Sequence, residues 1–176
     1  MLLYGKIGGK MMNGKLRNMT SIYLLDDEDN ILMLYRIGSK ALSMDCYIGT
    51  AGGHFEKDEL SDAKACVLRE LKEETGIEEK DIKDLQLKYV TMRLKKDELR
   101  NNYYFYARLV NKNVSISSNE GILNWFKPDE VPIDKMPHTA KYVMAHYLNV
   151  GKYNNKLYGG IAVENGVNFT ELKNFE

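Results

Sequence analysis

The chain has 176 residues, and its 25 lysines and arginines balance 25 aspartates and glutamates, for a formal net charge of zero. This balance argues against a general nucleic-acid binder, which carries a basic excess, and the 44% of hydrophobic residues argue against a disordered chain. Two cysteines, Cys46 and Cys66, are too few for a disulfide framework, so we expect a reducing, cytoplasmic compartment.

The first residues are rich in glycine and lysine, and no acidic residue precedes Asp26. We interpret residues 1–18 as a mobile N-terminal arm. Residues 19–176 are predicted to form a single domain with a C-terminal extension after about residue 150, because no linker or repeat interrupts them. No apolar run of about 18 residues occurs, so neither a membrane-spanning helix nor a membrane partner is expected.

A hairpin is predicted at the start of the domain. Residues 20–25 are β-branched, aromatic or aliphatic, residues 26–30 are short polar turn formers, and residues 31–35 form the returning strand. A short strand at residues 47–50 then leads into Gly52-Gly53.

The clearest helix is predicted from Asp62 to Thr75, with Ser61 as its N-cap and Gly76 as its stop. A turn at Asn101-Asn102 is expected to join two longer strands, and the tail is ambiguous, with a strand expected near residues 158–163. The other predicted strands and the second helix cover residues 85–95, 103–110, 123–126 and 138–150. This order of elements predicts an α+β fold, an α/β/α sandwich with a mixed β-sheet.

Three carboxylates share one face of the predicted helix, because Glu70, Glu73 and Glu74 are spaced i, i+3 and i+4. Like charges this close repel one another, and a hard divalent cation such as Mg²⁺ or Mn²⁺ would offset the repulsion. The preceding Gly52-Gly53 pair allows the backbone to approach a ligand and to present a carbonyl oxygen. The sequence therefore favours metal-assisted chemistry on a polyphosphate.

These segments resemble the Nudix box, in which a glycine and a glutamate precede a helical Arg-Glu-apolar-any-Glu-Glu-any-Gly-apolar sequence. Gly53 to Glu59 fits the first half, and Arg69 to Ile77 fits each specified position of the second. Nine residues, where the family has seven, separate Glu59 from Arg69. The resemblance implies a Nudix fold over about residues 18–150.

The resemblance also implies roles for the carboxylates. Glu70, Glu73 and Glu74 would bind Mg²⁺ or Mn²⁺ together with the Gly52 carbonyl, and Glu70 or Glu73 would act in catalysis. Arg69 would hold the carboxylates in place through ion pairs with Glu59 or Glu73.

Residues outside the helix are further candidates. Glu120, before the Trp125 strand, is similar to an additional metal-binding or base-like glutamate of MutT-type members, although an ordinary loop acid is equally compatible. Substrate contacts are assigned to Arg36, His54 and Glu59. The alternatives are a plain surface position for Arg36 and a loop-capping role for His54.

The function implied by the resemblance is hydrolysis of a nucleoside diphosphate linked to another group. Proteins with similar segments are commonly described as MutT-like, 8-oxo-dGTP-diphosphatase-type enzymes, so a nucleoside triphosphate converted to the monophosphate and pyrophosphate is the first expectation. ADP-ribose, a dinucleoside polyphosphate or a nucleotide sugar remains open, as does a non-catalytic nucleotide-sensing module. A nucleotide is the expected partner, no nucleic-acid polymer is expected, and a homodimer is possible.

Overall fold

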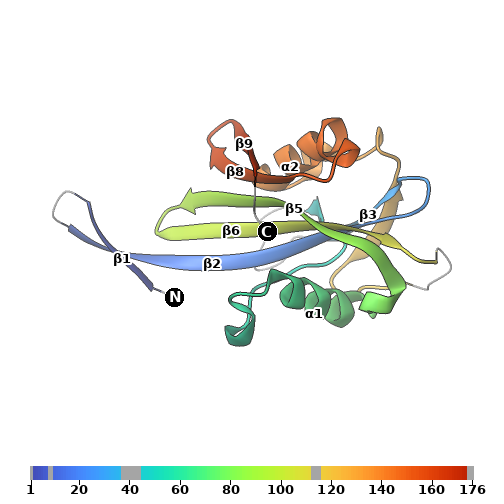
Figure 1. Cartoon of the computed structure of the whole chain (residues 1–176), viewed down its shortest axis with the longest axis horizontal. Helices are drawn as coiled ribbons and strands as arrows, with labels where there is room; N and C mark the ends of the chain where they lie inside the picture. The colour runs from blue at the N-terminus through green and yellow to red at the C-terminus, as the bar shows by residue number, and fades with distance from the viewer. Residues whose placement is uncertain (1, 8–9, 37–44, 112–115, 174–176) are drawn as a thin grey trace.

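The computed structural model describes residues 2–7, 10–36, 45–111 and 116–173, with side chains from residue 14 onward. One mixed sheet and two α-helices, α1 (Ala63–Thr75) and α2 (His138–Asn149), form the body (Figure 1). The strands are β1 (Leu2–Ile7), β2 (Lys10–Leu25), β3 (Ile31–Arg36), β4 (Cys46–Ile48), β5 (Ile82–Lys95), β6 (Glu98–Leu109), β7 (Ile122–Phe126), β8 (Leu157–Val163) and β9 (Gly166–Leu172). The α+β fold expected from the sequence is confirmed.

The strand order in the sheet is β4-β3-β2-β6-β5-β8-β9, with β1 added to β2 and β7 added to β3. Two pairs are parallel, β2 with β6 and β5 with β8, and the others are antiparallel. The sheet is therefore mixed, as predicted.

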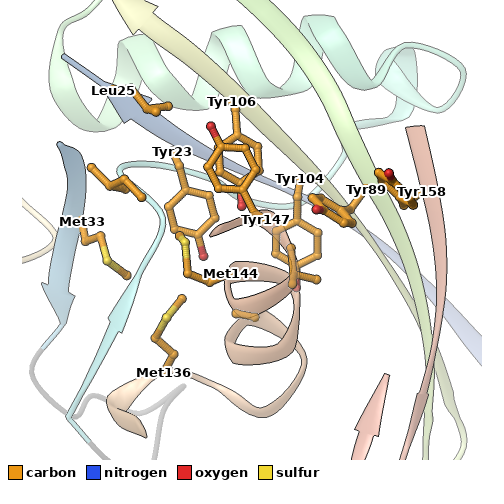
Figure 2. Close-up of a cluster of buried hydrophobic side chains, with 13 residues drawn as sticks. Tyr23, Leu25, Met33, Tyr89, Tyr104, Tyr106, Met136, Met144, Tyr147 and Tyr158 are labelled. Carbon is orange, nitrogen blue, oxygen red and sulfur yellow. The ribbon is translucent and has the colours of Figure 1, made fainter. Parts of the chain in front are cut away.

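Two apolar cores lie on opposite faces of the sheet. The α1 face is built around Ile22, Leu24, Val67 and Leu71, none of which is exposed. The α2 face is rich in tyrosine and methionine (Figure 2). Its rings pack closely, since Tyr106 and Tyr147 stack with centroids 3.7 Å apart. In Figure 1, α1 lies below the central strands, while α2 and the β8–β9 hairpin lie above them.

Helix α1 starts and ends for local reasons. The Asp62 carboxylate accepts a hydrogen bond from the Ala65 N–H at 2.9 Å, so Asp62 is the N-cap and the prediction of Ser61 is wrong by one residue. Gly76 ends the helix in the left-handed conformation with φ of 76°, and its N–H donates to the Lys72 carbonyl.

The N-terminal half of β2 corrects the sequence interpretation. Residues 15–18 pair with β6 in register, from Lys15 opposite Glu98 to Asn18 opposite Asn101. They belong to the sheet, so the prediction of a separate arm through residue 18 is wrong for this stretch. Residues 1, 8 and 9 of that predicted arm lie outside the described residues.

The β5–β6 hairpin and the tail also differ from expectation. The hairpin turns at Lys96-Asp97, and Asn101-Asn102 lie inside β6, opposite Met92 and Thr91. The C-terminal extension forms the hairpin of β8 and β9, which continues the sheet through the parallel pair of β5 and β8. No described helix is long and apolar enough to span a bilayer.

Candidate active site

The glycine loop is fixed to β2 by backbone hydrogen bonds. The Ile22 N–H donates to the Ala51 carbonyl at 2.9 Å, and the Thr20 N–H donates to the Gly53 carbonyl at 2.8 Å. These bonds bring the loop beside helix α1. The Gly52 carbonyl lies between these two carbonyls in the chain and is the one that the resemblance to the Nudix box assigns to metal binding.

Helix α1 packs two of its glutamates, Glu70 and Glu74, against this loop. A Cβ atom at position 53 would overlap the Glu70 carboxylate, so a side chain there would displace that carboxylate from its place against the loop. The Gly52 N–H donates to Glu74 Oε2 at 3.1 Å. The structure therefore brings the predicted residues Gly52, Glu70 and Glu74 together at the carboxylate face of the helix.

Arg69 connects the loop to the carboxylates. Its Nε and Nη2 donate to the two carboxylate oxygens of Glu59, at 2.7 and 3.0 Å. Its Nη1 donates to Glu70 at 2.9 Å and to Glu73 at 3.0 Å. Nη2 also donates to the His54 carbonyl at 3.1 Å. One guanidinium thus orients three carboxylates and a loop carbonyl through the planar fork of donors that arginine provides.

Glu59 reaches Arg69 despite the longer spacing between the two halves of the box. A short 3₁₀ turn over Lys57–Glu59 precedes the helix, and Glu59 also accepts a hydrogen bond from the Glu56 N–H at 2.9 Å. Hydrogen bonding to Arg69 lowers the pKa of Glu59 to about 2. The additional two residues therefore leave the ion pair in place.

Burial has the opposite effect on Glu70 and Glu74. It raises the pKa of Glu74 to about 7, with further upward contributions from the charges of Glu70 and Glu120. Burial also raises the pKa of Glu70, against the opposing hydrogen bond from Arg69. Negative charge at this site is thus under-compensated in the protein alone, which is the electrostatic situation that a bound cation relieves.

Arg36 and Glu120, two separately predicted residues, form an ion pair of 2.7 Å between Nη2 and Oε2. They come from distant parts of the sequence, at the end of β3 and just before β7. Strand β7 pairs with β3 and thereby places Glu120 beside Arg36. Both groups contribute to the electrostatics of Glu74, so they lie near the carboxylate face of α1.

The donor set fits a hard divalent cation. Its side chains offer carboxylate oxygens, which Mg²⁺ and Mn²⁺ prefer. No three His, Cys, Asp or Glu side chains of the described residues form a ready-made metal cage. Arg69 engages Glu70 and Glu73, the Gly52 N–H engages Glu74, and Arg36 engages Glu120. Glu70, Glu73, Glu74 and Glu120 would have to turn from these partners toward the metal.

Sequence reasoning missed the neighbourhood of His54. His54 Nε2 lies 2.5 Å from Arg17 Nη2, and the Phe55 and Tyr103 rings lie 5.2 Å apart. Arg17 falls in the stretch predicted as an arm, and that prediction separates it from the glycine loop. The signal was the β-strand pattern upstream of Thr20, where Leu16 and Asn18 share a face with Ile22.

Comparison with known proteins identifies the family of this arrangement. The model of the NUDIX domain matches residues 15–147, about three quarters of the chain. No curated protein matches the chain.

Several solved structures share the fold. The MutT protein of Bacillus halodurans is 20% identical, with a TM-score of 0.59 over 88% of this chain and 97% of that one. The E. coli ORF135 protein is 18% identical, with a TM-score of 0.59 over 85% and 94% of the two chains. A NUDIX hydrolase of Nitrosomonas europaea is 13% identical, with a TM-score of 0.63 over 92% and 93%.

Proposed function

This chain belongs to the NUDIX family and is a Nudix hydrolase, and we propose that it hydrolyses a nucleoside diphosphate linked to a further group, with Mg²⁺ or Mn²⁺ as cofactor. A nucleoside triphosphate is the simplest substrate of this kind. Its products would be the monophosphate and pyrophosphate, as expected for a MutT-like sanitising enzyme. The observation that carries the proposal is the glutamate cluster of α1, in which Glu70 and Glu74 pack against the glycine loop and Arg69 orients Glu70 and Glu73.

The metal site proposed for this function consists of the Gly52 carbonyl and the carboxylates of Glu70, Glu73, Glu74 and Glu120. When bound, the divalent ion would neutralise phosphate oxygens and lower the pKa of a coordinated water. The raised pKa of Glu74 supports this set, because a buried carboxylate that resists ionisation gains most from a neighbouring cation.

The protein residues supply orientation and proton transfer. Glu70 is our candidate general base, because burial raises its pKa toward neutrality and it lies against the loop where a polyphosphate would approach. It would accept the proton of the attacking water as the new oxygen–phosphorus bond forms and the anhydride bond breaks. Arg69 would orient Glu70 and Glu73, while Arg36 and His54 would contact phosphate oxygens.

Substitution of Glu73 or Glu74 by glutamine tests this assignment. We expect either variant to lose about 100-fold or more in kcat on a nucleotide panel with Mg²⁺, because each substitution removes a proposed metal ligand. Glu79→Gln is the matched control. Glu79 forms an ion pair of 2.7 Å with Lys64 on the exposed turn after the helix. We therefore expect the Glu79→Gln variant to retain wild-type activity.

Near-full activity of both Glu73→Gln and Glu74→Gln would overturn the assignment. A wild-type chain that binds nucleotides but hydrolyses no member of the panel would instead identify a nucleotide-sensing module. Product analysis on the same panel distinguishes pyrophosphate release from other cleavages.

A further inference from the structure

A pocket of about 310 Å³ opens on the α2 face of the sheet, between β5, β6 and the segment that follows α2. Its volume is at the lower end of the range for small-molecule sites. The stacked rings of Tyr106 and Tyr147 form part of its lining (Figure 2). None of the candidate active-site residues lines this pocket, and α1 packs on the other face of the sheet. The pocket is therefore separate from the carboxylate face.

The lining of this pocket is predominantly cationic. Lys88, Arg108 and Lys152 line it, together with one carboxylate, Asp84. Asp84 is exposed whereas Lys88 is buried, so the carboxylate lies toward the mouth and the ammonium group lies deeper. The acidic group at the mouth therefore leaves the positive charge at the base uncompensated.

Lys88 is the residue on which the inference depends. Its side chain is only 3% exposed, and its Nζ donates to the Asn154 carbonyl at 2.5 Å. An ammonium group has three donors, and no other hydrogen bond or ion pair joins Lys88 to the described residues. A buried charge without a counter-charge is costly. The base of the pocket thus offers an ammonium group that lacks an anion.

The electrostatics of Lys88 agree with this geometry. Burial lowers the pKa of Lys88, and no described carboxylate, Asp84 included, opposes that shift. The charged form is therefore poorly solvated in the protein alone. An anion in the pocket would supply the missing counter-charge.

The other two cations differ in how far they are already compensated. Arg108 donates to the Asp26 carbonyl at 2.6 Å and forms an ion pair with Asp29, so much of its charge is balanced. Lys152 has its Nζ 4.9 Å from the centre of the Tyr153 ring and forms no ion pair with a described carboxylate. Lys88 and Lys152 thus leave two positive charges open, which suits a doubly charged phosphate better than a singly charged carboxylate.

We propose that this pocket is a second ligand site of the chain, for a phosphate anion held by Lys88 at its base and by Lys152 nearer its mouth. The ligand is either free phosphate or the phosphate group of a small ester, since both present the same oxygens to Lys88. The inference is independent of the proposed reaction, because the site shares no residue with the catalytic face.

The test is calorimetric titration of the full chain with sodium phosphate, at constant ionic strength and with a chelator present. We expect Lys88→Met to weaken phosphate binding about tenfold or more, because a charge-assisted hydrogen bond is lost from a buried place. Lys152→Ala should weaken it about threefold, since a more exposed charge contributes less.

Lys141→Ala is the matched control for Lys152→Ala. The Lys141 Nζ lies 5.0 Å from the centre of the Tyr142 ring, so the variant removes the same charge and the same kind of ring contact outside the pocket. Its phosphate affinity should stay within about twofold of the wild type. Thermal unfolding verifies that each variant is folded, and if Lys88→Met does not fold, Lys152→Ala decides.

Amide chemical shifts of the wild type locate the bound anion. We expect phosphate to move the amide signals of Gly151 and Asn154 and to leave that of Gly53 unchanged. Shifts confined to Gly53 and α1 would place the anion in the catalytic site and overturn the proposal. So would equal phosphate binding by the wild type and both lysine variants, or no binding by the wild type up to about 10 mM phosphate.

A parallel titration with glycerol 3-phosphate distinguishes the two sources of the anion. Tighter binding of glycerol 3-phosphate than of phosphate assigns the site to phosphate esters, and the opposite order assigns it to the free ion. Either order supports the site if Lys88→Met weakens the binding, and overturns it if Lys88→Met binds both ligands as the wild type does.

Discussion

Glu74 links the stability of the protein to pH. Its pKa of about 7 in the folded chain exceeds the ordinary value of 4.5, so folding favours the protonated carboxyl. Raising the pH from 4.5 through 7 ionises Glu74 in a buried place, and the metal-free protein should lose stability across this window.

Glu74→Gln should remove this loss, because the amide cannot ionise and its oxygen still accepts the Gly52 N–H. In the presence of a chelator, we expect its Tm to exceed that of the wild type by about 3 °C at pH 8 and to match it at pH 5. Scanning calorimetry at the two pH values provides the measurement. If the Tm difference between Glu74→Gln and the wild type is the same at pH 5 and pH 8, ionisation of Glu74 is not the cause of the stability loss.

At the scale of elements, helix α1 depends on the conformation of one residue after its end. Gly76 has a φ of 76°, and a Cβ atom added there would meet no atom within 4 Å. Replacement by alanine is therefore strained by backbone conformation alone and should cost about 1 kcal/mol of unfolding free energy.

Urea unfolding of Gly76→Ala and Gly76→Asn checks this prediction. Asparagine tolerates the left-handed conformation better than alanine, so Gly76→Asn should cost less than Gly76→Ala. Equal costs for the two variants would show that the left-handed conformation is not what limits this position.

The same helix explains how far the sequence predicts the site. Spacing alone placed Glu70, Glu73 and Glu74 on one face, and the stop at Gly76 was correct. The Arg36–Glu120 pair could not be derived in this way, because it depends on the pairing of β3 with β7, which brings together residues 84 positions apart. Non-local pairing of this kind leaves no periodic signal in the chain.

The predicted strand boundaries near residues 15–18 and 101–102 were wrong for a related reason. Asn101-Asn102 were expected in a turn, since asparagine favours turns. In the structure the pairing of β6 with both β2 and β5 overrides that preference. The same pairing incorporates residues 15–18, whose composition alone suggested an arm.

At the scale of the whole molecule, the C-terminal hairpin completes the core on the α2 face. Tyr158 and Phe169 pack on Tyr89, with ring centroids 5.5 and 5.6 Å away, and Tyr89 itself is fully buried. Truncation after Asn155 should therefore lower Tm by about 10 °C or more, since several buried aromatic contacts are lost.

Thermal unfolding of this truncated chain, beside a control that lacks only residues 173–176, measures the effect. The control should match the full chain, because it retains both strands of the hairpin. If the chain truncated after Asn155 has the same Tm as the full chain, the core is complete without β8 and β9.

The contact between Gly53 and Glu70 has an evolutionary consequence. The glutamate carboxylate fills the space that a side chain at position 53 would need. A side chain at 53 would push this carboxylate away from the loop. The two positions should therefore tend to change together: a lineage that uses the glutamate in this place keeps the glycine, and a lineage that loses the glutamate becomes free to acquire a side chain at 53. Joint loss of the pair would then mark descendants that retain the fold and have abandoned the chemistry.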